Sequence, residues 1–311
     1  MRFVETFRAD DRPELLALSG GEVFLRPKLV RELADRASLV GCRTGALSGM
    51  FWASAKPIPP PIKLAIDALD HFGVSLDVFH EREVDRHDVY RVLDTLLEEG
   101  KDVSVHLVGL GPDDPYLAER TEEVRERFDD RVPMLVNGVN AVGRAAEWLV
   151  EPESGPMPAV VEADPCTLAN WPLVAFDGTI VACGNDDVVD GPAPAHLRLG
   201  HAAVDGWPQI RARCLTSAML RSIRTFGPLH TADRHSALAC SGYCTTCQLL
   251  STDPEIEASV AAAMGRPGAE FLEQQVQTLE REAGAVSFAR RFGMAAYAHL
   301  VTLGTPRPVA A

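Results

Sequence analysis

The chain lacks a long apolar segment, an excess of basic charge and an export signal. No apolar run reaches the ~18 residues that a membrane-spanning helix needs, and the N-terminus shows no signal-peptide pattern. Lysine occurs at only four positions, and the formal net charge is −14 at pH 7. Because nucleic acids and anionic membranes attract basic surfaces, a chain this acidic is poorly suited to either partner. We therefore expect a protein that binds neither nucleic acid nor a membrane.

The seven cysteines do not suggest a disulfide framework. An odd number of cysteines in a sequence without an export signal favours the reducing cytoplasm. Hydrophobic residues make up 46% of the chain and charged residues 24%, as in ordinary globular proteins. A chain of 311 residues is long enough for two domains with a sizeable core. We expect a soluble, cytoplasmic protein.

Strand and helix patterns alternate through the first half of the chain. The strand candidates are short apolar runs at residues 15–18, 44–47, 74–78, 103–108 and 134–136. Stretches of helical periodicity lie between them, at residues 27–37, 62–72, 88–99 and 115–128. Strand–helix units repeated about every 30 residues imply a parallel sheet, either open or barrel-like. Residues 1–150 are therefore predicted to form an α/β domain.

The composition changes at residues 151–158, a segment rich in Glu, Pro, Gly and Ser that is typical of a linker. Beyond it, two apolar runs flank Asp177-Gly178, a pair that predicts a β-hairpin. A helix is expected near residues 207–226. Further helical segments are expected at 258–264, 270–282 and 289–303. We expect a small second domain at residues 151–251 and a helical tail at residues 252–311.

Five cysteines of the second domain form two spaced groups. These are Cys166-x11-Gly178-x4-Cys183 and, about 57 residues later, Cys240-x3-Cys244-x2-Cys247. Grouped thiolates are what an iron–sulfur cluster or a structural zinc ion requires, and the spacing suits both. Five candidates for four positions leave one thiol spare. The alternative is a set of unrelated buried thiols, which is how we interpret Cys42 and Cys214.

Polar motifs follow several predicted strands, where parallel α/β proteins place functional groups. In Ser19-Gly20-Gly21-Glu22, the glycines allow a backbone to approach a ligand, and the carboxylate could bind an ammonium group. The alternative is an ordinary turn whose glutamate is favoured by the helix dipole. Asp77 and His80 follow a later strand, although a histidine there is often only a hydrogen-bonded structural residue. Gly143-Arg144 follows the last strand and could also approach a ligand.

Taken together, these features resemble the radical S-adenosylmethionine enzymes with a C-terminal SPASM or twitch iron–sulfur domain. Gly20, Gly21 and Glu22 are similar to the family's Gly-Gly-Glu motif, which binds the amino group of S-adenosylmethionine. Ser75 and Asp77 resemble its fourth strand, whose polar residues face this cofactor. Gly143 and Arg144 resemble the segment near the adenine. The resemblance covers roughly residues 1–250.

The resemblance implies a partial parallel (β/α) barrel followed by a domain that binds an auxiliary [4Fe–4S] cluster. The implied ligands are Cys166, Cys183, Cys244 and Cys247, with Cys240 as a competing ligand. In complete relatives, reductive cleavage of S-adenosylmethionine gives a 5′-deoxyadenosyl radical that abstracts hydrogen from a peptide or small metabolite.

One element of the family pattern is absent. The family's first strand is followed by a Cys-x3-Cys-x2-Cys loop that holds the radical-generating cluster, but residues 1–19 contain no cysteine. Either Met1 is an internal residue of a longer protein, or the protein is a shortened, catalytically altered relative. The missing strand implies an exposed sheet edge along residues 15–18, which a partner protein or a preceding segment would cover.

Two other functions fit the same residues. One is a non-catalytic, metal-stabilised module that recognises a peptide or a partner enzyme. The other is a zinc-containing α/β enzyme that acts at the strand ends around Asp77 and His80. Metal analysis of the purified protein separates the iron–sulfur interpretation from the zinc enzyme. Formation of 5′-deoxyadenosine separates a radical enzyme from a binding module.

Overall fold

A computed structural model describes residues 1–141, 145, 147–149, 161–236 and 242–305. The chain forms two compact units. Unit 1 contains Met1, residues 3–141 and residues 283–311, and unit 2 contains Arg2 and residues 142–282. Of the residues expected to form a helical tail, 252–282 belong to unit 2 and 283–311 to unit 1. None of the described helices is both long enough and apolar enough to cross a membrane.

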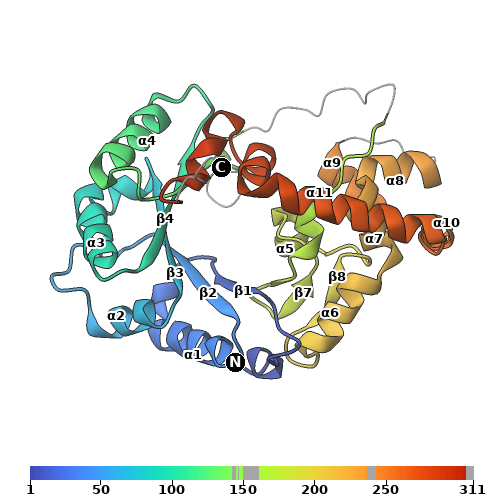
Figure 1. The fold of residues 1–311 in the computed structure, drawn as a ribbon, viewed down its shortest axis with the longest axis horizontal. Coiled ribbons are helices and arrows are strands. Elements are labelled where there is room, and N and C mark those ends of the chain that lie inside the picture. The colour runs from blue at the N-terminus through green and yellow to red at the C-terminus, as the bar shows by residue number, and fades with distance from the viewer. Residues whose placement is uncertain (142–144, 146, 150–160, 237–241, 306–311) are drawn as a thin grey trace, which may run out of the picture. The chain divides into compact units, whose positions relative to one another are not determined.

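Unit 1 is built on a five-stranded parallel sheet, curled like half of a barrel, in the order β1-β2-β3-β4-β5 (Figure 1). The strands are β1 (Leu15–Leu18), β2 (Arg43–Ser48), β3 (His71–Asp77), β4 (Asp102–Gly109) and β5 (Met134–Gly138). The predicted α/β partial barrel is therefore confirmed. Only β3 begins clearly earlier than expected, because His71 and Phe72 already pair with β2.

The helices of unit 1 lie on the outer side of the sheet (Figure 1). They are α1 (Pro27–Ser38), α2 (Pro60–Asp67), α3 (Arg86–Glu98) and α4 (Pro115–Phe128), with 3₁₀ turns η1 (Val4–Thr6), η2 (Val23–Leu25) and η3 (His80–Arg82). Proline in the first turn starts α1, α2 and α4. The Asp85 and Asp114 carboxylates cap α3 and α4 by accepting backbone N–H bonds of 2.8 and 3.0 Å.

The two faces of the sheet differ in polarity. Phe72, Val74 and Leu76 of β3 are at most 1% exposed and pack against the helices in one hydrophobic core. The alternate residues of the same strand, Ser75 among them, point to the opposite, inner face. The neighbouring strand β4 repeats this pattern, with Ser104 and His106 on the inner face. Strands β2 and β5 place Leu47 and Leu135 on the same face. The inner face is therefore polar along β3 and β4 and apolar on either side of them.

The two edge strands of the sheet differ in what lies beside them. β1 is an edge strand, and β2 is its one strand neighbour in the sheet. At the other edge, the Met294 N–H donates a 2.8 Å hydrogen bond to the Val136 carbonyl of β5. The following 3₁₀ helix η6 (Ala295–Thr302) contacts β5, and its Leu300 is buried in the same core. The returning C-terminal segment therefore completes the β5 side of unit 1.

Unit 2 contains a small antiparallel sheet in the order β6-β7-β8. Its strands are β6 (Leu173–Val174), β7 (Thr179–Val181) and β8 (Arg198–His201). The predicted hairpin is confirmed: Gly178 has φ +92°, and the Asp177 carboxylate accepts bonds from the Thr179 N–H (2.8 Å) and hydroxyl (2.9 Å). The short strand β8 was not anticipated.

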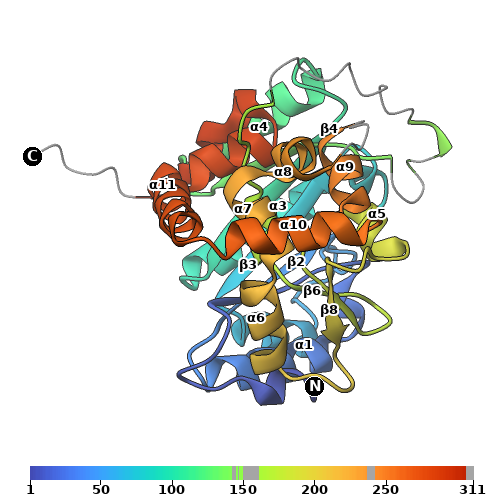
Figure 2. The ribbon, with the colours of Figure 1, turned by 90° about the vertical axis from the view of Figure 1, so that its right-hand side faces the viewer.

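The other described elements of unit 2 are helices. They are η5 (Thr167–Asn170), α5 (Asp186–Asp190), α6 (Trp207–Thr216), α7 (Ala218–Phe226), α8 (Pro228–His235), α9 (Tyr243–Leu249) and α10 (Pro254–Met264). Figure 2 shows α10 beside α7 and α8, with which it is in contact. The predicted helix 207–226 is two helices, because Ser217 leaves helical geometry and caps α7 with its hydroxyl. The helix α11 (Pro267–Phe292) connects the units and is kinked at Gly284.

Candidate functional site

Unit 2 brings four of the five predicted metal ligands into one neighbourhood. Cys166 directly precedes η5, Cys183 follows β7, and Cys244 and Cys247 lie on α9. Burial raises the pKa of Cys183, Cys244 and Cys247, and the charge of Cys166 raises each of these pKa values further. Electrostatic coupling of this kind requires the thiols to be near one another. The fifth candidate, Cys240, lies outside the described residues.

Backbone hydrogen bonds fix the position of Cys166. Its N–H donates to the Ile223 carbonyl (3.1 Å), and the Asp164 N–H donates to the Phe226 carbonyl (2.9 Å), so this segment lies along the end of α7. The Tyr243 hydroxyl at the start of α9 donates a 2.6 Å bond to the Asp164 carbonyl. These bonds join the segment that carries the first thiol to the helix that carries the last two.

A histidine that the sequence did not single out lies beside the thiols. The His196 side chain is only 8% exposed, and its Nε2 is 3.9 Å from Sγ of Cys247. Its Nδ1 is buried and has no hydrogen-bond partner among the described residues. Burial lowers the pKa of His196 to about 4, so the imidazole is neutral at pH 7. No spacing rule points to this residue, because it lies in an irregular segment between α5 and β8.

The donor set has chemistry suited to a metal but is not arranged for a single ion. Within the described ranges, no three side chains of His, Cys, Asp or Glu lie close enough together to hold one metal ion. The remaining two cysteines are packing residues, as expected: Cys42 is 2% and Cys214 is 3% exposed. The Cys214 thiol donates to the Ala169 carbonyl, and burial raises its pKa.

A second polar site lies at the carboxyl ends of the strands of unit 1. After β1, the Glu22 carboxylate accepts hydrogen bonds from the backbone N–H groups of Phe24 (2.8 Å) and Gly49 (2.9 Å) and from the Ser48 hydroxyl (3.0 Å to Oε2). The Ser48 hydroxyl in turn accepts the N–H of Met50 (3.0 Å), a buried residue with φ +59°. Glu22 therefore holds the ends of β1 and β2 together, a structural role that the sequence did not reveal.

Gly20 and Gly21 precede this carboxylate with φ values of +92° and +50°. A Cβ atom at either position would meet no other atom within 4 Å. Glycine is therefore required by the left-handed backbone and not by close packing within the protein. The backbone of both residues is exposed and remains accessible to a ligand.

Asp77 and His80 form a hydrogen-bonded pair after β3. Asp77 accepts bonds from the N–H groups of Phe79 (2.8 Å) and His80 (2.9 Å) and from Nδ1 of His80. Burial alone would raise the pKa of Asp77, but the bonds and charge of His80 lower it overall. The hydrogen bond that His80 donates to Asp77 raises the pKa of His80 against the effect of burial, and the charges of Asp77, Glu83 and Glu22 add to the increase.

The other ring nitrogen of His80 faces the end of β2. A Cβ atom at Gly49 would lie 3.0 Å from Nε2 of His80 and 3.6 Å from Oε2 of Glu22. The absent side chain at Gly49 thus leaves room for the imidazole beside Glu22. Three strand ends consequently contribute Glu22, Gly49, Asp77 and His80 to one place, and Ser75 lies on the same face as Asp77, half-buried and paired in register with His106. Gly143 and Arg144 lie outside the described residues.

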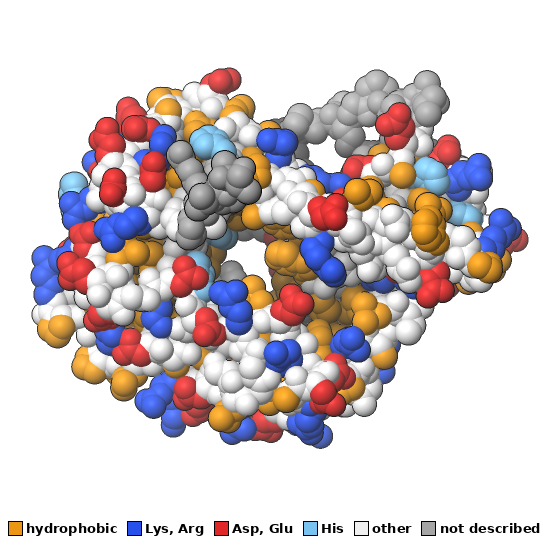
Figure 3. All heavy atoms as spheres, viewed as in Figure 1, with side chains coloured by type: hydrophobic (Ala, Val, Ile, Leu, Met, Phe, Trp, Pro, Cys, Tyr) orange, Lys and Arg blue, Asp and Glu red, His pale blue; other side chains and the backbone are white. Residues whose placement is uncertain are grey.

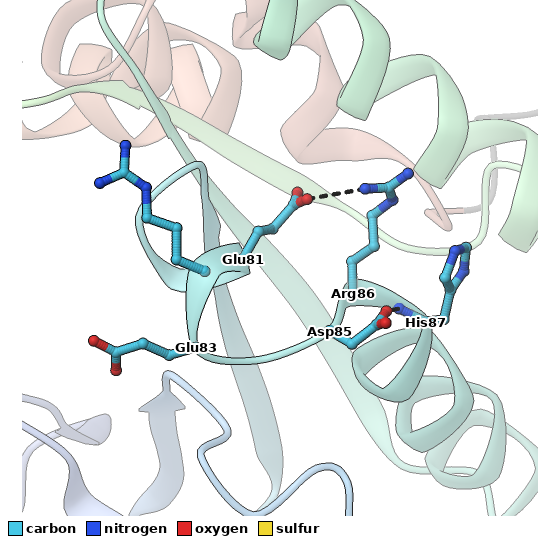
Figure 4. A pocket seen from close by; sticks show the side chains of 6 residues that line it. Glu81, Glu83, Asp85, Arg86 and His87 are labelled. Carbon is cyan, nitrogen blue, oxygen red and sulfur yellow. Dashed lines mark hydrogen bonds and ion pairs between the residues drawn. The ribbon is translucent and has the colours of Figure 1, made fainter.

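A shallow depression of about 350 Å³ adjoins this pair. Its lining residues are Glu81, Arg82, Glu83, Asp85, Arg86 and His87 (Figure 4). Glu81 accepts a 3.0 Å bond from Arg86 and a 2.8 Å bond from the Tyr116 hydroxyl, whose pKa is raised by burial and by Glu81. Acidic and basic side chains are also interspersed over the face of the molecule in Figure 3. The depression is therefore an open polar surface on which Glu81 is bound by Arg86 and Tyr116, and not an enclosed pocket.

Comparison with known proteins does not assign the chain to a family. No protein-family model matches the sequence, and no curated protein is significantly similar to it.

Proposed function

We propose that this is an iron–sulfur protein whose unit 2 holds a [4Fe–4S] cluster on Cys166, Cys183, Cys244 and Cys247. The observation that carries this proposal is the convergence of these thiols from three separate segments of the chain. Each ionised thiol makes ionisation of its neighbours less favourable. A cationic iron–sulfur core would remove this penalty, because metal binding deprotonates thiols and neutralises their charge.

A cluster and a single zinc ion place different demands on the thiols, and their spacing in the sequence suits both. The ligands of one tetrahedral ion crowd around it, with Zn–S bonds of about 2.3 Å. A cubane cluster keeps its four thiolates farther apart, since each binds a different iron atom. Among the described residues no three of these donors lie close enough together to hold one ion, and we propose the cluster from the grouping of the four thiols, with zinc as the alternative that metal analysis tests.

We propose in addition that the inner face of unit 1 binds S-adenosylmethionine near Gly20, Gly21, Glu22, Ser75 and Asp77. The polar residues that β3 and β4 present on this face and the exposed glycine backbone support such a ligand. The Glu22 carboxylate already accepts bonds from its own chain, so an ammonium group would be an additional partner of a fixed, preorganised acid. Hydrogen abstraction from a peptide or small metabolite needs three more thiolates, which residues 1–19 do not contain.

The test is anaerobic reconstitution with iron and sulfide, followed by metal analysis and an absorption spectrum. We expect equal amounts of iron and sulfide and visible charge-transfer absorption. Serine replacement of Cys166, Cys183, Cys244 or Cys247 should each lower the iron content, whereas the matched Cys42→Ser variant should retain it. A wild-type protein that binds no iron, or four variants that bind as much as wild type, would refute the proposal. Assay of 5′-deoxyadenosine then tests turnover separately.

The pair at the strand ends supports a second candidate, a zinc-containing α/β enzyme that transfers protons. Asp77 holds Nδ1 of His80 and leaves Nε2 facing Gly49 and Glu22. A carboxylate that orients an imidazole in this way is how a proton-transferring histidine is held. Purified protein that retains zinc but takes up no iron would favour this candidate over the cluster.

A further inference from the structure

The buried His196 imidazole has no assigned role and points at one of the proposed ligands. Its Nε2 lies 3.9 Å from Sγ of Cys247. The Ala182 N–H donates a 2.8 Å bond to the Leu197 carbonyl, so the residues next to Cys183 and next to His196 are tied together. The imidazole thus bridges the hairpin segment that carries Cys183 and the helix α9 that carries Cys247.

The unpartnered Nδ1 limits what Nε2 can do. A neutral imidazole carries its proton on one nitrogen only. If Nε2 bound a metal ion, the proton would be on Nδ1, where a buried N–H would lack an acceptor among the described residues. Metal-binding histidines usually donate that second N–H to an acceptor. If Nε2 carries the proton, Nδ1 has only a lone pair without a hydrogen-bond donor, which proteins tolerate better than a buried N–H without an acceptor.

We infer that His196 is a positioning residue that donates a hydrogen bond from Nε2–H to the Cys247 thiolate and does not itself bind metal. This inference rests on the proposed cluster as its setting. A hydrogen bond to a ligating sulfur stabilises negative charge on it and so favours the reduced cluster. Removal of His196 should therefore shift the reduction potential to a more negative value without removing iron.

The experiment uses the full chain with His196→Leu, His196→Gln and the control His235→Leu. His235 lies in the same unit, and its Nδ1 is hydrogen-bonded to the Ser259 hydroxyl (2.8 Å). After reconstitution, we expect all three variants to bind as much iron as wild type. His196→Leu alone should show a clear negative shift in midpoint potential, and His196→Gln should recover part of it, because its amide can also donate. Thermal unfolding confirms that each variant folds.

Two outcomes would overturn the inference. If His196→Leu loses iron as a Cys247→Ser variant does, His196 is a ligand; if its potential equals that of His235→Leu, His196 is a bystander. A second measurement does not depend on a cluster. Selective ¹⁵N labelling of histidine in the metal-free wild type, with the signal assigned by its loss in His196→Gln, should show Nε2 protonated and Nδ1 unprotonated. The reverse tautomer would contradict the inference, whereas failure of the wild type to bind iron refutes only the proposed cluster.

Discussion

Replacement of Gly227 by alanine tests whether the backbone around Cys166 is as tightly specified as the structure indicates. Gly227 lies between α7 and α8 with φ +81° and ψ 163°, a conformation nearly restricted to glycine. A Cβ atom there would lie 2.0 Å from the Asp164 carbonyl oxygen and 2.7 Å from its carbon. Both atoms belong to the backbone, so rotation of a side chain cannot relieve the clash.

The expected cost of Gly227→Ala follows from two contributions. The strained backbone of a non-glycine residue costs about 1–3 kcal/mol. The displaced segment would also lose the hydrogen bonds of the Asp164 and Cys166 N–H groups, which contribute about 0.5–1.5 kcal/mol each. Together these give a loss of about 2–6 kcal/mol, a large share of the 5–15 kcal/mol that stabilises a typical domain. Since Cys166 moves with the segment, the iron content should fall as well.

The assay combines thermal unfolding, followed by circular dichroism, with iron analysis after reconstitution. The matched control is Gly100→Ala, because Gly100 also has a positive φ (+77°) but a Cβ atom there would meet nothing within 4 Å. The control should lose about 1 kcal/mol from backbone strain and keep its iron. If Gly227→Ala behaves like this control in both measurements, the contact with Asp164 does not hold Cys166 in place and the reasoning fails.

Three further substitutions have defined outcomes. The Asp77–His80 pair should stabilise unit 1 most between about pH 4 and pH 6.5, where Asp77 is ionised and His80 is protonated. The stabilisation should be lost at lower pH as Asp77 becomes protonated, and at higher pH as His80 becomes neutral. Urea unfolding of Asp77→Asn should give a free energy of unfolding that changes less with pH on both the acidic and the basic side of this range. An unchanged pH dependence would contradict the pairing. Glu22→Gln should cost about 1–3 kcal/mol in the same assay, because the amide nitrogen that replaces one carboxylate oxygen is a donor and faces other donors. The control Glu98→Gln replaces an exposed glutamate and should be neutral. Glu273→Ala should cost about 3–5 kcal/mol, since it removes the carboxylate beside the buried Arg224, and the exposed Glu270→Ala measures the background; equal melting temperatures would exclude this role.

Local sequence patterns were sufficient for most of unit 1, because each strand and helix there has its own periodicity and its own start signal. The pattern failed where the deciding interaction is distant in sequence. β3 starts at His71 because β2 offers it hydrogen-bond partners, and no local feature shows this pairing. The return of Met294 to the edge of β5 could not be read either, so the tail was expected to be a separate part. The strand β8 has the sequence Arg-Leu-Gly-His, with Leu199 as its one apolar side chain, so no apolar run marks it.

The candidate sites show the same division. The spacing of the cysteines in the sequence predicted that Cys166, Cys183, Cys244 and Cys247 form one site, because cysteine is rare and its grouping is itself informative. Glutamate and histidine are common, and their roles depend on what surrounds them. The partners of Glu22 at Ser48 and Gly49 are 26 and 27 residues away, so its structural role was hidden. His196 became notable only when burial and the nearby Sγ of Cys247 were known.

The two candidate sites depend on different parts of the chain. The four proposed ligand thiols and His196 belong to unit 2, whereas Glu22, Asp77 and His80 belong to unit 1. Substitutions in contact with no common partner usually have additive effects. Iron content and the pH dependence of unit 1 are therefore separate observables, and either can be lost while the other is kept. A protein that binds a cluster but not S-adenosylmethionine would thus still satisfy everything that the thiols support, and would be an iron–sulfur binding module instead of a radical enzyme.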